Sequence, residues 1–134
     1  IPSTASKVLT VGAYDALTNA YADFSGRGGR NGIQKPDLVA PGVDILTAAP
    51  DGGYTRQTGT SFAVPFVTGA AALLMQYGVI NGNDPYLYGE KVKAYLRRGA
   101  APLPGIREYP DERVGYGRLC ILEAFPRSSV PPFV

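Results

Sequence analysis

The 134-residue sequence contains no histidine, no tryptophan and only one cysteine. The lack of histidine removes the most common general acid and base of enzymes, so chemistry that needs an imidazole cannot be completed by these residues alone. The lone Cys120 excludes an internal disulfide, and we interpret it as a small, partly buried apolar side chain.

A strong net charge is absent as well. Thirteen basic and eleven acidic residues give a net charge of +2, and the basic residues are scattered except around Arg97, Arg98 and Arg107. This balance predicts no nucleic-acid partner and no attraction to an anionic membrane.

A membrane span and a signal peptide are also missing from the sequence pattern. The longest apolar run, residues 62–75, contains Pro65, Thr68 and Gly69 and is shorter than the roughly 20 residues that cross a bilayer. No basic start precedes an apolar stretch, and the chain opens on Ile1 rather than methionine. We therefore expect no membrane partner, and we interpret the chain as a processed product or a part of a longer protein.

The composition is that of one globular unit, with 45% hydrophobic and 18% charged residues and neither an internal repeat nor a linker. The hydrophobic pattern predicts strands at 8–13, 20–24, 43–48 and 54–58. Residues 61–77 are apolar almost all round, which predicts a buried central helix, and a second helix is expected at 89–98. Strands packed with two helices predict an α/β layered fold, followed by a loose, proline-rich tail at 125–134.

The junction between an extended segment and the long helix is Gly59-Thr60-Ser61. The first N–H groups of a helix lack internal partners and, together with the helix dipole, favour negative charge. A serine at that place can attack a carbonyl while backbone N–H groups receive the oxyanion, and Gly59 allows close approach of a substrate. Serine is also a favoured N-cap, worth about 1 kcal/mol to a helix, so the residue types alone leave a purely structural role open.

Five segments, in order along the chain, resemble segments of the subtilisin-like serine proteases, the subtilases. The serine motif of that family is similar to residues 59–69, which read GTSFAVPFVTG. The other similar segments are 8–13 (VLTVGA), 24–25 (FS), 35–43 (KPDLVAPGV) and 114–119 (VGYGRL). The chain departs from the family pattern at Phe66, where histidine is usual, and at Val64, where a small residue is usual.

The resemblance implies both a fold and a chemistry. Residues 1–134 would form the C-terminal portion of a subtilisin-like catalytic domain, an α/β layered fold with a mostly parallel sheet and a central buried helix that starts at the serine. Ser61 would be the nucleophile of a serine endopeptidase that cleaves protein or peptide substrates through an acyl-enzyme. The backbone of Gly59, Thr60 and Ser61 would support the oxyanion, with the Ser61 N–H as one donor.

In this family the catalytic triad runs aspartate, histidine, serine along the chain. The resemblance therefore implies that the aspartate, the histidine and the oxyanion-hole asparagine lie before Ile1, which agrees with the lack of histidine. We expect the chain to be inactive alone and to have the N-terminal part of the same domain as its partner. The alternative is a pseudoprotease, or a binding or regulatory domain without hydrolysis, because the upstream residues are not in this sequence.

Many subtilases hold a structural cation, and the resemblance implies where it would lie. The ligands would be the carbonyl oxygens of Ser3, Ala5 and Val8 with the carboxylate of Asp37, which are the hard oxygen ligands that calcium or sodium takes. Lys35 stands where a second carboxylate would help, and this argues against the site. We expect no cofactor to be required for catalysis.

Two further expectations follow from the resemblance. A cut inside the sheet would leave an unpaired strand edge and an uncovered helix face, so the chain alone is expected to self-associate or to stay bound to its N-terminal part. Subtilases are mostly secreted, attached to the cell envelope or active in spores, and the segment 109–117 resembles the spore-germination branch of the family. Substrate specificity stays open, because most pocket walls would come from residues before Ile1.

Overall fold

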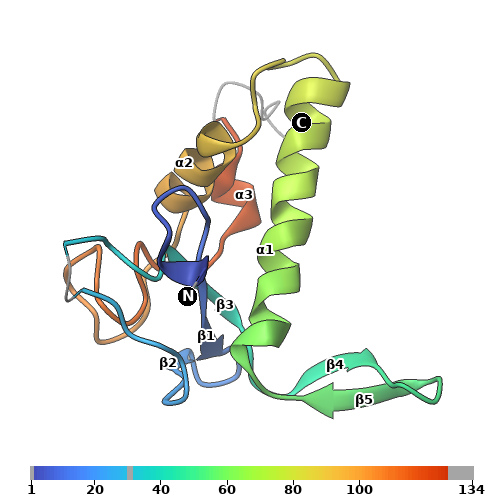
Figure 1. Cartoon of the computed structure of the whole chain (residues 1–134), viewed down its shortest axis with the longest axis vertical. Coiled ribbons are helices and arrows are strands. Elements are labelled where there is room, and N and C mark those ends of the chain that lie inside the picture. Colours follow the sequence, from blue (N-terminus) through green and yellow to red (C-terminus); the bar gives the residue numbers. More distant parts are fainter. Residues whose placement is uncertain (1, 30–31, 127–134) are drawn as a thin grey trace, which may run out of the picture.

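The computed structural model describes residues 2–29 and 32–126, and Figure 1 shows how their helices and strands are arranged. In chain order the elements are η1 (Pro2–Thr4), β1 (Val11–Asp15), β2 (Ala20–Tyr21), β3 (Leu38–Pro41), β4 (Ile45–Ala48), β5 (Tyr54–Gln57), α1 (Thr60–Met75), η2 (Gln76–Ile80), α2 (Glu90–Arg98) and α3 (Ile121–Ala124). The element η1 is a single 3-10 turn, and η2 continues α1 with π-helical geometry.

The centre of the sheet is a parallel pair, β1 and β3, in which Val11 lies opposite Leu38 and Ala13 opposite Ala40. Strand β2 pairs antiparallel with the end of β1, so the strand order is β2-β1-β3. Strands β4 and β5 form a separate antiparallel hairpin, which extends away from the rest of the molecule in Figure 1. The fold is therefore mixed α/β, with its parallel pair where the long helix packs.

Successive side chains of a strand point to opposite faces, and this divides the core in two. Ala13 and Leu38 lie in the larger cluster, together with buried side chains of α1 and α2. Tyr14 and Val39 point to the other face and pack against side chains from the segment 103–114. The helices thus cover one face of the sheet, and the irregular C-terminal segment covers the other.

Helix α1 begins at Thr60, so the helix start predicted at Ser61 is confirmed to within one residue. Its buried residues are Ala63, Val67, Ala70 and Leu74, which recur every three or four positions and so form one stripe. Two of the four are alanines, whose small side chains let the helix lie close to the sheet.

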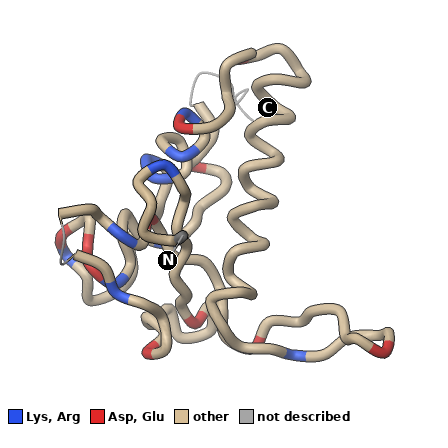
Figure 2. The backbone as a smooth tube through the Cα atoms, viewed as in Figure 1, with Lys and Arg blue, Asp and Glu red and all other residues tan. Residues whose placement is uncertain are grey.

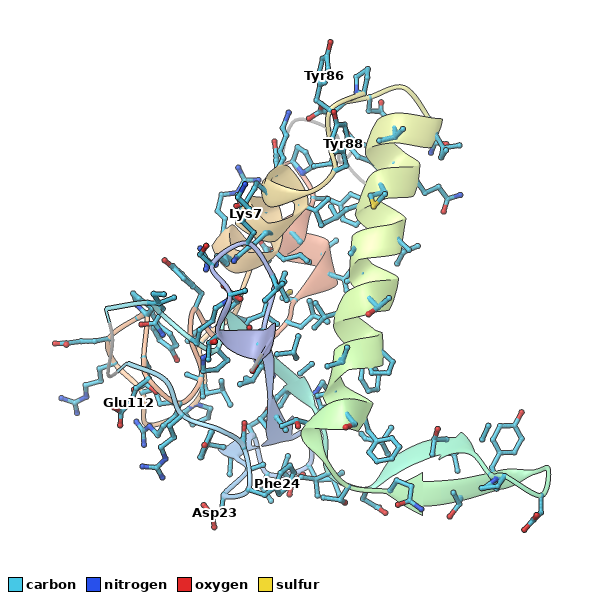
Figure 3. The ribbon with its side chains drawn as sticks, in the orientation of Figure 1. Lys7, Asp23, Phe24, Tyr86, Tyr88 and Glu112 are labelled. Atoms are coloured by element: carbon cyan, nitrogen blue, oxygen red, sulfur yellow. The ribbon has the colours of Figure 1, made fainter. Side chains whose placement is uncertain are left out.

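Burial of α1 is one-sided in the described chain, rather than all round as its composition predicts. The large exposed hydrophobic side chains of α1 and η2 are Val64, Phe66, Leu73, Met75, Val79 and Ile80. Figure 2 shows no charged residue along α1, and in Figure 3 the side chains that face away from the sheet have no other described element over them. The segment Thr60–Ile80 is apolar and long enough to cross a membrane by composition alone, but its other face packs in the core described above.

Two differences from the sequence-based prediction have physical reasons. Strand β1 begins at Val11 rather than at residue 8, because the Val8 carbonyl accepts hydrogen bonds from lysine side chains instead of from a neighbouring strand. The first residue of the predicted loose tail, Phe125, packs against the rest of the protein. Its ring lies edge-on to the Tyr77 ring, with 5.4 Å between the ring centroids. The rest of that tail, 127–134, lies outside the described residues.

Candidate active site

Ser61 is the second residue of α1 and is exposed. The N-cap position belongs to Gly59, and no side-chain hydrogen bond caps the helix. The hydroxyl of Ser61 therefore does not have the capping role that the sequence left open. A serine that is exposed at a helix start and does not cap it is available to a substrate.

The backbone around Ser61 presents N–H groups in the direction of the helix N-terminus. The Phe62 N–H donates to the Gly59 carbonyl at 3.1 Å, whereas the amides of Thr60 and Ser61 belong to the first turn, which has no preceding helical carbonyls. These amides and the helix dipole together favour a negative charge beside Ser61. The Gly59 N–H instead donates to the Gly42 carbonyl, and the oxyanion support expected from Gly59, Thr60 and Ser61 stays a prediction.

Gly42 fixes the position of this first turn relative to the sheet. Its N–H donates to the Tyr14 carbonyl at 3.1 Å, and its carbonyl accepts from the Gly59 N–H at 2.8 Å. A Cβ atom at Gly42 would lie 2.6 Å from the Ala13 Cβ and 3.0 Å from the Gly59 oxygen. The end of β3, the end of β1 and the residue before α1 therefore meet at a point where only glycine fits.

We expect Gly42→Ala to lower both stability and any activity that depends on Ser61. The added methyl group must push β1 and the start of α1 apart, and overpacking of this kind costs about 1–3 kcal/mol. Thermal unfolding and kcat of the intact protein measure the two effects. Gly69→Ala is the matched control, because a Cβ there has nothing within 4 Å and the residue does not line the cleft at Thr60. Equal effects of both variants would show that the contact at Gly42 does not position the serine.

A cleft of about 750 Å³ reaches the start of α1 at Thr60. It is lined by residues around η1, by Gly12 in β1 and by the glycine-rich loop 26–29, with Lys35 and Glu112 supplying charge. Glycines along its wall leave backbone groups accessible to a bound chain. The cleft therefore offers a path along the described surface to the first turn of α1.

Of the four residues expected to hold a cation, Val8 and Asp37 are brought together, but their oxygen atoms already have partners. The Val8 carbonyl accepts from Lys35 Nζ and from Lys93 Nζ, each at 2.8 Å. The Ser3 carbonyl accepts from Thr10 Oγ1 at 2.6 Å. Among the described residues, no hydrogen bond joins Ala5 to Ser3, Val8 or Asp37.

The carboxylate of Asp37 is fully buried and is held by three positive side chains. Lys35 Nζ lies 3.0 Å from Oδ2, Lys93 Nζ lies 3.4 Å from Oδ1, and the Arg97 guanidinium pairs with Oδ1. Burial by itself raises the pKa of Asp37, but hydrogen bonds from the Thr10 N–H, Lys35 and Arg97 outweigh it and hold the pKa below its ordinary value.

The expected calcium or sodium site does not fit this arrangement. A metal ion at Val8 and Asp37 would meet two ammonium groups and a guanidinium, whose charges repel it and whose hydrogen bonds it would have to replace. In the described part of the chain there is also no group of three histidine, cysteine, aspartate or glutamate side chains that could hold a metal.

The sequence indicated Lys35 but not its two basic neighbours. Lys93 and Arg97 lie about sixty residues after Asp37, and only the packing of α2 against the sheet brings them there. A signal was nevertheless present, because the two are four residues apart on one helix and flank the buried Val92 and Leu96. The pattern places this basic pair beside the buried face of α2, but it does not identify the acidic partner.

Comparison with known proteins agrees with this architecture. The subtilase family matches residues 1–117 of the chain. Because this match covers most of the sequence, the chain belongs to the subtilase family. Its mixed α/β fold, with a serine at the start of the longest helix, is the fold of a subtilisin-like protease.

Two curated relatives and two solved structures show the extent of the similarity. An intracellular serine protease of Paenibacillus polymyxa is 36% identical over 105 residues, covering 75% of this chain and 30% of that protein. Subtilisin-like protease 10 of Arthroderma otae is 42% identical over 80 residues, covering 60% of this chain and 19% of that protein. The Clostridium perfringens CspB protease superposes with a TM-score of 0.87 at 44% identity, covering 92% of this chain and 27% of that one.

The prenylagaramide maturation protease PagA superposes with a TM-score of 0.76 at 40% identity, and the match covers 92% of this chain and 43% of that one. The chain thus spans less than half the length of each of these relatives. One relative is named an intracellular protease, so membership of the family does not fix a location. The resemblance of the segment 109–117 to the spore-germination branch stays a prediction.

Proposed function

We propose that this chain is the serine-bearing part of a subtilisin-like endopeptidase domain and that Ser61 is its nucleophile. The observation that carries the proposal is the exposed Ser61 in the first turn of α1, with no capping role and with N–H groups beside it. Membership of the subtilase family supports the same reaction class, because the relatives described above are proteases.

The reaction that this geometry supports is acyl transfer. A histidine from another part of the domain takes the Ser61 proton as the hydroxyl oxygen attacks the carbonyl carbon of the scissile peptide bond. The negative charge that forms on the carbonyl oxygen is stabilised by the Ser61 N–H at the positive end of α1. Collapse of this intermediate expels the amine, which takes the proton, and water then hydrolyses the acyl-enzyme to the acid.

The general base and its orienting aspartate are proposed to come from the remainder of the same domain. The sequence contains no histidine, and in the subtilisin order the serine is the last member of the triad. Peptide hydrolysis by the intact protein tests the proposal. Hydrolysis that survives removal of the Ser61 hydroxyl would overturn it, and absence of hydrolysis in the intact protein would favour a binding or regulatory subtilase domain.

The uncovered face of α1 is proposed to bind that remainder of the domain. A groove of about 340 Å³ runs between α1, α2 and the start of β1, and it is lined mainly by apolar residues such as Leu9, Val64 and Met75. On the same side, β1 has a second edge at Val11 and Gly12, the one that faces away from β3. Among the described residues no strand pairs with this edge. A strand from the remainder of the domain could pair with this edge of β1 and turn an apolar side chain toward α1. It would then cover both the edge and the groove.

Without that cover, the chain alone is expected to self-associate at micromolar concentration. Each Å² of apolar surface removed from water contributes about 25 cal/mol, which favours pairing of exposed α1 faces. Phe66→Glu with Leu73→Lys should weaken this association in sedimentation velocity experiments. Leu17→Lys is the control, because Leu17 is an exposed leucine outside α1. A compact monomer of the unchanged chain would contradict the prediction.

A further inference from the structure

A cluster of basic side chains surrounds Asp37 at the end of the sheet opposite to Ser61. The Asp37 N–H donates to the Thr10 carbonyl just before β1, whereas Gly42, which follows β3, carries the bond to Gly59 before the serine. The four-residue strand β3 separates the two ends by about 13 Å. The cluster therefore takes no part in the proposed hydrolysis, and its role concerns the fold.

Lys93 contacts main-chain oxygen atoms that an ordinary salt bridge would not need. Its Nζ donates to the carbonyls of Ser6 at 2.7 Å and of Val8 at 2.8 Å, and it lies 3.4 Å from Asp37 Oδ1. The side chain reaches these oxygens from α2 and is 7% exposed. Three oxygen neighbours use the full donor capacity of an ammonium group.

Lys35 completes the arrangement from the other side. Its Nζ shares the Val8 carbonyl with Lys93, at 2.8 Å, and pairs with Asp37 Oδ2 at 3.0 Å. The oxygens around the two lysines are the Ser6 and Val8 carbonyls, before β1, and the Asp37 carboxylate, before β3. Carbonyl and carboxylate oxygens are the ligand types that bind calcium or sodium. Here the same oxygens accept hydrogen bonds from two ammonium groups. These groups supply the positive charge that a metal ion would otherwise supply.

We infer that Lys93 and Lys35 are a built-in replacement for a bound cation, occupying the oxygen site formed by Ser6, Val8 and Asp37. The ammonium groups tie the segment before β1 to α2 and to β3, as an ion with the same ligands would. The fold is then independent of a metal ion at this place. Removal of the Lys93 ammonium would take one donor away from each of the Ser6 carbonyl, the Val8 carbonyl and Asp37 Oδ1, while Lys35 stays on Val8 and Arg97 on Asp37, and a bound cation would then replace the lost charge.

The test is thermal unfolding of the intact protein and its Lys93→Ala variant in sodium chloride, in calcium chloride and in EDTA, at matched ionic strength. Lys93→Ala is expected to lower the Tm by about 10 °C, because a buried charge cluster loses one partner. Calcium or sodium should then raise the Tm of this variant by several degrees relative to its value in EDTA and a large organic cation. The readout is folding, so it does not depend on the proposed peptidase activity.

Lys91→Ala is the matched control on the same helix. Lys91 is exposed and pairs with Asp84 at 2.5 Å, so its removal should change the Tm little and create no cation response. If Lys93→Ala does not fold, Lys35→Gln replaces it, with the same expected gain of cation response. Equal cation responses in the parent and all variants would overturn the inference. A cation response of the parent that Lys93→Ala abolishes would overturn it as well.

Discussion

Ser61→Ala in the intact protein is expected to lower kcat for peptide hydrolysis by about 10⁶-fold, the loss that the corresponding change causes in subtilisin. The physical reason is that no other group can form the acyl-enzyme, so only transition-state binding by the backbone remains. Steady-state hydrolysis of a chromogenic peptide measures the loss. A decrease of only a few fold would mean that Ser61 is not the nucleophile.

The stability of the same variant separates a catalytic from a structural serine. Ser61 is exposed and does not cap α1, so its replacement should change the free energy of unfolding by no more than about 0.5 kcal/mol. Ser25→Ala gives the opposite result, since the buried Ser25 Oγ accepts from the Ala13 N–H at 2.9 Å. That amide would be left without its partner at a cost of about 1–3 kcal/mol, while hydrolysis per folded molecule persists.

The chain of residues 1–134 alone is expected to hydrolyse peptides about 10⁶-fold more slowly than the intact protein. Its serine hydroxyl has no imidazole to remove its proton, because the sequence contains no histidine. Addition of the remainder of the domain as a separate polypeptide should restore activity, since the α1 face and the β1 edge give it a surface to bind. The same addition to the Ser61→Ala chain is the control and should restore nothing.

Activity of the chain alone would contradict this prediction directly. Such a result would require a different base among the residues present, for example a lysine or an aspartate. Failure of the two parts to bind would instead contradict the proposed cover of α1. A pull-down assay, run beside the activity assay, distinguishes the two outcomes.

The start of α1 could be predicted from sequence because its signals are local. Gly59 and Ser61 mark the junction, and the apolar residues after them specify a helix without reference to the rest of the fold. The one-sided burial of α1 could not be predicted, because the composition shows that a face is apolar but not which element covers it. Phe66 and Leu73 follow the same pattern as Val67 and Leu74, yet only the latter two are buried.

The expected cation site depends on contacts between residues far apart in the sequence, and these were harder to predict than the start of α1. The structure brings Asp37 and Val8, two of the four expected ligands, to the ammonium group of Lys35. The identity of their partner depends on Lys93, which comes from a helix far along the chain. Contacts across such a sequence separation are decided by packing, and the sequence of α2 does not say which of its basic side chains meets Asp37.

The central claim, that Ser61 is an activated nucleophile, is tested most directly by a fluorophosphonate probe, which reacts with serines that have a functioning base. The intact protein is treated with the probe, digested and mapped by mass spectrometry. We predict stoichiometric labelling at Ser61, none in the Ser61→Ala variant and none in the chain 1–134 alone. Absence of label from Ser61 in an intact protein that hydrolyses peptides would contradict the account.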